Sequence, residues 1–87
     1  MKYGVKFHKK AVEEFKRIDP VWQRRIKAKI LQLAENPASL KHNLKALKGN
    51  LQDLFRLRVG SYRIIFQKKE NDLIIIIIRI AHRREVY

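Results

Sequence analysis

The chain has 87 residues, enough for one domain with one modest hydrophobic core. It carries 21 lysines and arginines against 8 acidic residues, a net charge of +13, and 46% of its residues are hydrophobic. This composition argues against an intrinsically disordered chain. It favours a folded protein that binds polyanions, with nucleic acid as the first candidate and an anionic membrane surface or an acidic protein as the second.

Two absences narrow the class of protein further. The sequence has no cysteine, which excludes disulfides and thiolate metal sites. Its longest apolar run, residues 73–78, is too short to cross a bilayer as a helix, and the basic N-terminal segment does not resemble a signal peptide. We therefore expect a single cytoplasmic domain over residues 1–87, with no membrane attachment.

The N-terminal part of the chain predicts one strand and two helices. Residues 2–8 alternate polar and apolar side chains, which is the period of a half-buried strand. Apolar residues then recur at helical spacing up to Asp19, and again from Pro20 to Asn36, where Pro37 ends the pattern. Asp19 is suited to cap the second helix, because Pro20 then takes its first position. The expected helical hairpin has these apolar stripes: Ala11, Val12, Phe15 and Ile18, then Trp22, Ile26, Ile30, Leu33 and Ala34.

Residues 38–50 place leucines between basic side chains and predict a loop with at most a helical turn. Residues 54–66 then predict a β-hairpin. If Gly60 and Ser61 form a two-residue turn, Val59 pairs with Tyr62, and Arg58 pairs with Arg63. One face of this hairpin is apolar and consists of Phe55, Leu57, Val59, Tyr62, Ile64 and Phe66.

The other face of the hairpin is cationic. Successive side chains of a strand point to opposite faces, so Arg56, Arg58 and Arg63 share one face with Ile65. Like charges on neighbouring strands repel one another, and a purely structural strand would more often mix signs here. We interpret the three arginines as a phosphate-binding patch; the alternative is a solvated strand face in a basic protein.

A polar turn at residues 69–72 precedes the last predicted strand, which is rich in isoleucine and ends near Ile80. Strict alternation places Ile74, Ile76, Ile78 and Ile80 on one face, and Ile75, Ile77, Arg79, Ala81 and Arg83 on the other. His82 then falls with the core, as a packing or capping side chain, unless a bulge near Ala81 changes its direction. Tyr87 either pins the tail to the sheet or stacks on a base or donates a proton.

The element order predicts an α+β fold. It comprises an N-terminal strand, a two-helix hairpin and three or four antiparallel strands, or β-α-α-β-β-β. Strands joined by tight turns are antiparallel, so the helices should pack on one face of the sheet and leave the other face accessible.

The acidic residues do not form a cluster that could hold metal ions, and there is no glycine-rich phosphate loop. We therefore expect no metal and no cofactor. Any cleavage of nucleic acid would depend on side chains alone, with cations stabilising the extra charge of a pentacoordinate phosphorane.

Three segments together resemble the RelE/ParE superfamily of toxin–antitoxin systems, and the RelE branch most. They are residues 47–49 (Leu-Lys-Gly), 54–66 and 82–87 (His-Arg-Arg-Glu-Val-Tyr), and the resemblance covers essentially the whole chain. It implies a ribosome-dependent endoribonuclease that cuts mRNA in the A site, without metal, through attack of the 2′-hydroxyl on the adjacent phosphate. A RelB-like antitoxin is the implied protein partner, and the ribosome and mRNA are the implied targets.

The resemblance also implies roles for individual residues. Arg56, Arg58 and Arg63 would grip the scissile phosphate, Arg83 would assist at the leaving oxygen, and Tyr87 would stack on a base. Some relatives carry lysines where this chain has Arg56 and Arg58, and arginine is a poor general base because it stays protonated. His82 is the nearby side chain whose ordinary pKa suits proton transfer.

The wider basic surface would dock ribosomal RNA. Its residues are Arg24, Arg25, Lys27, Lys29, Lys41, Lys45 and Lys48. Two other functions remain open at this point. A ParE-like DNA gyrase inhibitor shares the fold but usually lacks the strand arginines and the terminal aromatic residue, and a non-catalytic RNA-binding module needs only the basic face.

Overall fold

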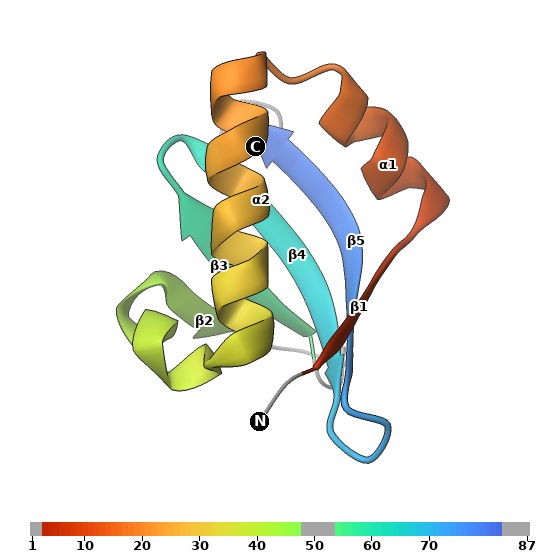
Figure 1. The fold of residues 1–87 in the computed structure, drawn as a ribbon, viewed down its shortest axis with the longest axis vertical. Coiled ribbons are helices and arrows are strands. Elements are labelled where there is room, and N and C mark those ends of the chain that lie inside the picture. Colours follow the sequence, from red (N-terminus) through yellow and green to blue (C-terminus); the bar gives the residue numbers. More distant parts are fainter. Residues whose placement is uncertain (1–2, 48–53, 83–87) are drawn as a thin grey trace.

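The computed structural model describes residues 3–47 and 54–82, which form an α+β fold with a single five-stranded sheet (Figure 1). The order of the strands in the sheet is β1-β5-β4-β3-β2. This confirms the predicted fold class. The elements along the chain are β1 (Gly4–Phe7), α1 (Lys9–Lys16), α2 (Pro20–Glu35), the 3-10 helix η1 (Pro37–Asn43), β2 (Leu44–Ala46), β3 (Leu54–Val59), β4 (Tyr62–Lys69) and β5 (Ile74–His82).

Helix α2 begins and ends where the sequence predicts, whereas α1 ends at Lys16, so that Ile18 of the predicted stripe lies in the connection between the helices. The carboxylate of Asp19 accepts a hydrogen bond of 3.0 Å from the N–H of Val21 and caps α2, whose first residue is Pro20. Helix α2 ends at Glu35, directly before Asn36 and Pro37. A side-chain amide of α2 also binds the end of α1, since Gln23 donates to the carbonyl of Phe15 at 2.8 Å.

Strand β1 departs from the expected antiparallel sheet, because it pairs in parallel with β5, from Gly4 beside Ile74 to Phe7 beside Ile77. Parallel neighbours need a long crossover, and here the whole chain between the first and last strands supplies it. The other departure is β2, a three-residue edge strand in the segment predicted as a loop. A strand this short shows no periodicity in the sequence.

The hairpin of β3 and β4 has the predicted register, with Val59 opposite Tyr62 and Arg58 opposite Arg63. Gly60 has a φ of 58°, the left-handed conformation that glycine adopts without steric cost. The indole ring of Trp22 packs so closely on Gly60 that a Cβ there would collide with it. The turn therefore requires glycine for its backbone and for its contact with α2.

Strand β5 contains a β-bulge, which corrects the predicted assignment of its faces. Ile65 of β4 lies opposite Arg79, whereas Phe66 lies opposite Ile77, so Ile78 is the extra residue. The bulge reverses the alternation, and the core side chains are Ile75, Ile77 and Ile80 rather than Ile74, Ile76, Ile78 and Ile80. A run of isoleucines gives no signal for a bulge, because each position is equally apolar.

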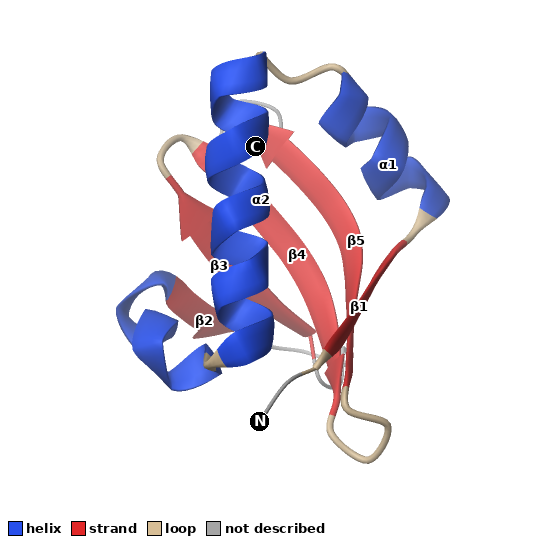
Figure 2. Cartoon of the chain, in the orientation of Figure 1, coloured by secondary structure: helices blue, strands red, loops and turns tan. Residues whose placement is uncertain are grey.

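The core lies between α2 and the sheet. Figure 2 shows α2 lying across one face of the sheet, with α1 beside β5 where β1 has ended. Ile26, Ile30 and Leu33 of α2 are buried against Leu57 and Ile64 of the hairpin. Both α-helices thus lie on the same side of the sheet, as predicted. Within residues 3–47 and 54–82, no helix is long and apolar enough to span a membrane.

Candidate nucleic-acid interface

The strands place three arginines together on the face of the sheet opposite α2, which we call the arginine face. Arg58 and Arg63 are direct cross-strand neighbours and line a hollow of about 140 Å³ with Gly60 and Ser61. Arg56 lies one row further along β3, opposite Ile65 on one side and Lys45 on the other. Lys45, predicted as part of a separate basic surface, therefore joins the arginine face.

Arg56 has an unusual environment within this face. Its side chain is half-buried, and its Nε is buried without a hydrogen-bond partner in the described structure. Leaving a buried donor unpaired costs about 1–3 kcal/mol, and more for a charged group, so natural proteins rarely do so without a functional reason. This Nε is enclosed in the described structure, so an anion bound at the arginine face would reach it only after a change in the Arg56 side-chain rotamer.

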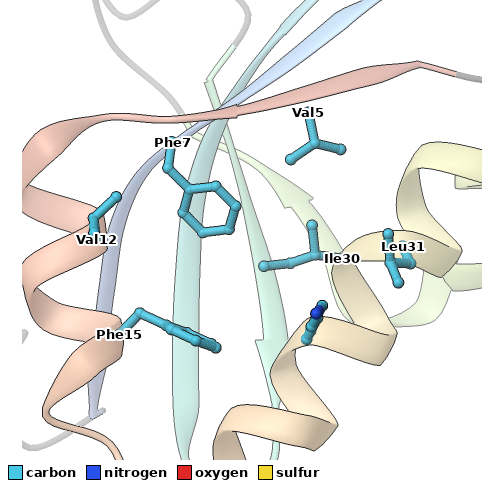
Figure 3. A pocket seen from close by; sticks show the side chains of 7 residues that line it. Val5, Phe7, Val12, Phe15, Ile30 and Leu31 are labelled. Atoms are coloured by element: carbon cyan, nitrogen blue, oxygen red, sulfur yellow. The ribbon is translucent and has the colours of Figure 1, made fainter.

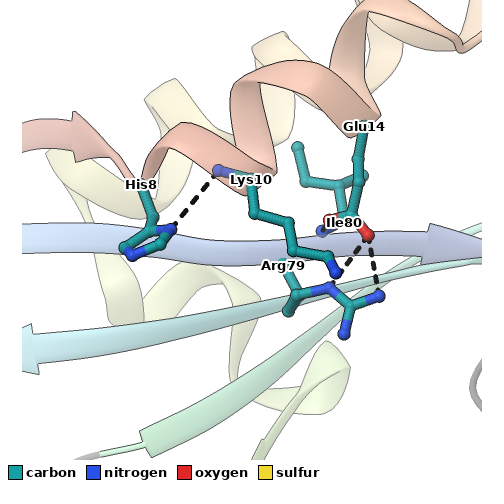
Figure 4. Close-up of polar contacts among 5 residues, drawn as sticks. All are labelled: His8, Lys10, Glu14, Arg79 and Ile80. Atoms are coloured by element: carbon teal, nitrogen blue, oxygen red, sulfur yellow. Dashed lines mark hydrogen bonds and ion pairs between the residues drawn. The ribbon is translucent and has the colours of Figure 1, made fainter.

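Arg79 lies in the same cross-strand row as Arg56, with Ile65 between them. Helix α1 holds Arg79 at the edge of the sheet (Figure 4). The Glu14 carboxylate accepts a hydrogen bond of 2.8 Å from Nε of Arg79 and another of 2.8 Å from the backbone N–H of Ile80. Burial raises the pKa of Glu14, but these two hydrogen bonds and the charges of Arg79 and Lys10 outweigh it and lower the pKa below its ordinary value. Glu14 therefore fixes the bulged strand and neutralises Arg79.

His82 lies apart from the three arginines. It is the cross-strand neighbour of Tyr62, on the face that carries the helices, and the two rings meet edge to face with their centroids 5.3 Å apart. Arg63 instead pairs with Ala81 and points to the other face. The structure therefore gives His82 the packing position that strict alternation predicts, and it does not bring His82 to the arginine face.

The structure does not describe all of the predicted site residues. Lys48, Arg83 and Tyr87 lie outside the described residues. The remaining cations lie on α2 and η1, on the helix side of the sheet: Arg24, Arg25, Lys27, Lys29 and Lys41. The set predicted to dock RNA is thus divided between the two sides.

The helix side also carries an apolar groove between the splayed helices, with a volume of about 310 Å³ (Figure 3). Val5 and Phe7 of β1, Phe15 of α1 and Leu31 of α2 line it, and Phe7 and Leu31 remain 41% and 53% exposed. Exposed apolar side chains gathered in a groove are typical of a binding site for a partner protein. The sequence predicted the helical hairpin but not the groove, because the angle between the helices depends on tertiary packing.

Among the described residues, no three His, Asp or Glu side chains come together in a group that could hold a metal ion. The chemistry that the arginine face itself offers is electrostatic. Arginines can bind a phosphate through directed, charge-assisted hydrogen bonds and stabilise negative charge that develops on it.

Comparisons with known proteins identify the family to which the chain belongs. The model of the ParE toxin family of type II toxin–antitoxin systems, parDE, matches residues 5–87, and the chain belongs to this family. It is 33% identical over 88 residues to a Methanocaldococcus jannaschii protein described as toxin RelE1, covering all of this chain and 97% of that protein. The predicted resemblance to the RelE/ParE superfamily is confirmed.

Solved structures of toxin–antitoxin complexes also contain chains that are similar to this one. The archaeal RelE–RelB complex from Pyrococcus horikoshii contains a chain that matches with a TM-score of 0.81 and 29% identity, covering 95% of this chain and 97% of that one. The Mycobacterium tuberculosis RelBE2 complex matches with a TM-score of 0.82 and 23% identity, covering 95% and 93%, and shows the shared fold.

Proposed function

We propose that this RelE/ParE-family protein is a metal-independent endoribonuclease that cuts mRNA in the ribosomal A site and so inhibits translation. The 2′-hydroxyl would attack the adjacent phosphorus, and the bond from phosphorus to the 5′-oxygen of the next nucleotide would break. A base takes the proton of the 2′-hydroxyl, and an acid protonates the leaving oxygen. The products are a 2′,3′-cyclic phosphate and a 5′-hydroxyl.

The observation that carries this proposal is the arginine face, where the register of β3 and β4 places Arg56, Arg58 and Arg63 together. Arg58 and Arg63 flank a small polar hollow, and Arg56 lies in the next row of β3 on the same face. Together they suit a phosphate whose charge increases in the transition state, and such preorganised donors are usually the largest single contribution to catalysis.

The arginines bind the phosphate, and other groups transfer the protons. Each stays protonated at neutral pH, so Arg56, Arg58 and Arg63 hold the phosphate and do not act as the base. His82 faces the helices beside Tyr62, and we propose that groups of the C-terminal tail or of the ribosome transfer the protons. In this proposal Arg83 assists at the leaving oxygen and Tyr87 stacks on a base, while the ribosome holds the mRNA for in-line attack.

A RelB-like antitoxin is the protein partner that we propose. The relatives from P. horikoshii and M. jannaschii were solved as RelE–RelB complexes. The apolar groove in Figure 3 is suited to an amphipathic helix, and the chain's net charge of +13 favours an acidic partner.

The test is cleavage of a translated message, with the wild type compared with Arg63→Ala and Tyr87→Ala. Loss of one oxyanion-stabilising donor typically costs about 100-fold to 1,000-fold in rate, and we expect Arg63→Ala to fall in that range. Mapping 5′ ends should place wild-type cuts within codons and only on translated messages. The exposed α1 residue Lys16 supplies a control, and Lys16→Ala should cleave like the wild type. Undiminished cleavage in both site variants would refute the site assignment.

A ParE-like inhibitor of DNA gyrase is the second candidate, because the family model that matches bears the name of ParE. A supercoiling assay separates the two functions. Inhibited gyrase with intact mRNA would favour this alternative, whereas salt-sensitive RNA binding with neither effect would identify a non-catalytic RNA-binding module.

A further inference from the structure

A second groove lies on the helix side, between α2 and the β3–β4 turn, and the proposed cleavage reaction does not use it. Its volume is about 360 Å³, within the range of about 300–1,000 Å³ typical of small-ligand pockets. Trp22, Arg25 and Lys29 of α2 line one wall, while Arg58 and Gly60 line the other. We call it the Trp22 groove.

Trp22 of this groove contacts the β3–β4 turn, Tyr62 and Arg25. Its indole packs against Gly60, where no side chain fits, and lies with its ring centroid 5.6 Å from that of Tyr62. On the other side, the guanidinium carbon of Arg25 lies 5.0 Å from the centroid of the indole ring. An arginine stacked on an aromatic ring presents a flat, cationic surface of the kind on which unpaired nucleobases stack.

The charges around the groove all have one sign. Arg25, Lys29 and Arg58 line it, the rest of the lining is mostly apolar, and no acidic side chain of the described chain is part of it. Apolar surface suits the face of a base, and the surrounding cations suit the phosphates on either side of it.

Arg58 connects this groove with the arginine face. It lines both the Trp22 groove and the hollow that it shares with Arg63. A single RNA strand could therefore pass around the β3–β4 turn, with one phosphate at the arginine face and a nearby nucleotide in the Trp22 groove.

We propose that the Trp22 groove binds a nucleotide of the same single-stranded RNA whose phosphate the arginine face holds. Arg25 and Trp22 receive the base, and Lys29 and Arg58 receive the flanking phosphates. The proposal rests on the proposed function only in taking RNA as the ligand, and not on cleavage. An acidic protein helix is the other chemically reasonable occupant, but the groove between α1 and α2 suits an amphipathic helix better, because among the described residues Lys27 is the one charged residue in its otherwise apolar lining.

Trp22 provides the test, because it is the only tryptophan of the chain and its fluorescence reports on this groove directly. The full-length protein is titrated with a short oligoadenylate whose 2′-O-methyl groups prevent cleavage. We expect a saturable change in Trp22 fluorescence that follows binding measured by anisotropy of the labelled oligonucleotide. The salt dependence of binding is the slope of log K, the logarithm of the binding constant, against the logarithm of the salt concentration. Lys29→Gln should make this slope shallower by about 0.7, which is the contribution of one phosphate contact on a single strand.

Lys16→Gln is the matched control, since it removes one exposed positive charge from α1, away from this groove. It should leave the slope and the fluorescence change as in the wild type. Binding of the oligoadenylate without a Trp22 response, equal effects of the two substitutions, or absence of binding would each overturn the proposal. So would a Trp22 response to an acidic amphipathic peptide but not to RNA. A Trp22 response in a protein that fails to cut translated mRNA would refute the proposed function and leave this inference standing.

Discussion

The two faces of the sheet are built from the same strands but differ in burial and charge. On the helix side, Leu57, Ile64 and Ile77 are completely buried. On the arginine face, the residues that alternate with them include Arg56, Arg58 and Arg63, none of which is fully buried. Alternation along a strand lets one short sequence fix the fold with one set of residues and present charge with the other. The comparison predicts that substitutions one residue apart affect different properties.

The largest expected difference in stability is between Ile64 and Ile65, neighbours on β4 with the same side chain. Ile64 is completely buried, whereas Ile65 is half-buried between Arg56 and Arg79 on the other face. Ile64→Ala should lower the free energy of unfolding by about 2–5 kcal/mol, because it removes apolar contacts and leaves a cavity. Ile65→Ala should cost less than about 1 kcal/mol. Urea unfolding of both variants measures the difference, and equal losses would contradict the division into two faces.

Glu14 is the next test, because it joins the two sides at the sheet edge. Its carboxylate reaches from α1 to Arg79 and to the N–H of Ile80. Glu14→Gln weakens both hydrogen bonds and removes the negative charge that pairs with Arg79. We expect a loss of about 1–3 kcal/mol at neutral pH. Glu13→Gln, one residue away at an exposed position, is the control and should change stability by less than about 0.5 kcal/mol.

The effect of Glu14 should depend on pH in a defined direction. The pKa of Glu14 in the folded protein is lower than its ordinary value of 4.5, so its ionised form stabilises the fold. This contribution is complete above the ordinary pKa and is lost as the pH falls through the lower, folded-state pKa. The difference in unfolding free energy between the wild type and Glu14→Gln should therefore shrink on acidification. A difference that stays constant down to low pH would show that the substitution acts through packing.

The parts of this structure that the sequence predicted depend on local signals. Asp19 and Pro20 mark the start of α2 through capping, and Gly60 sets the register that makes Arg58 and Arg63 neighbours. The bulge at Ile78 was not predictable, because it depends on how β5 meets β4 rather than on its own side chains. That bulge determines which isoleucines are buried.

In the candidate site, too, local sequence signals predict only some of the features. The alternation of β3 and β4 predicts the arginine face, since it depends only on register. The Trp22 groove was missed, because Trp22 fits the apolar stripe of α2 and its contact with Gly60 arises only when the helix packs on the turn. A tryptophan in a stripe surrounded by arginines and lysines was the available signal.

The smallest expected effect on stability is that of Arg58→Gln. It tests whether the arginines of the arginine face stabilise the fold. Arg58 lies directly opposite Arg63, and like charges in this position destabilise a sheet by about 0.2–1 kcal/mol. Arg58→Gln should therefore raise the free energy of unfolding slightly, and more at low salt, because screening weakens the repulsion. The same variant should cleave translated mRNA more slowly, as expected where a binding site is maintained at a cost in stability.

Arg24→Gln is the control for Arg58→Gln, since Arg24 is an exposed cation on α2. It should change stability by less than about 0.5 kcal/mol at either salt concentration. If Arg58→Gln instead destabilises the protein while Arg24→Gln does not, Arg58 supports the fold, and the arginine face loses its interpretation as a surface kept for phosphate. A gain in stability with a loss of cleavage would place the two faces under separate constraints, since the residue that weakens the fold would be one that the reaction requires.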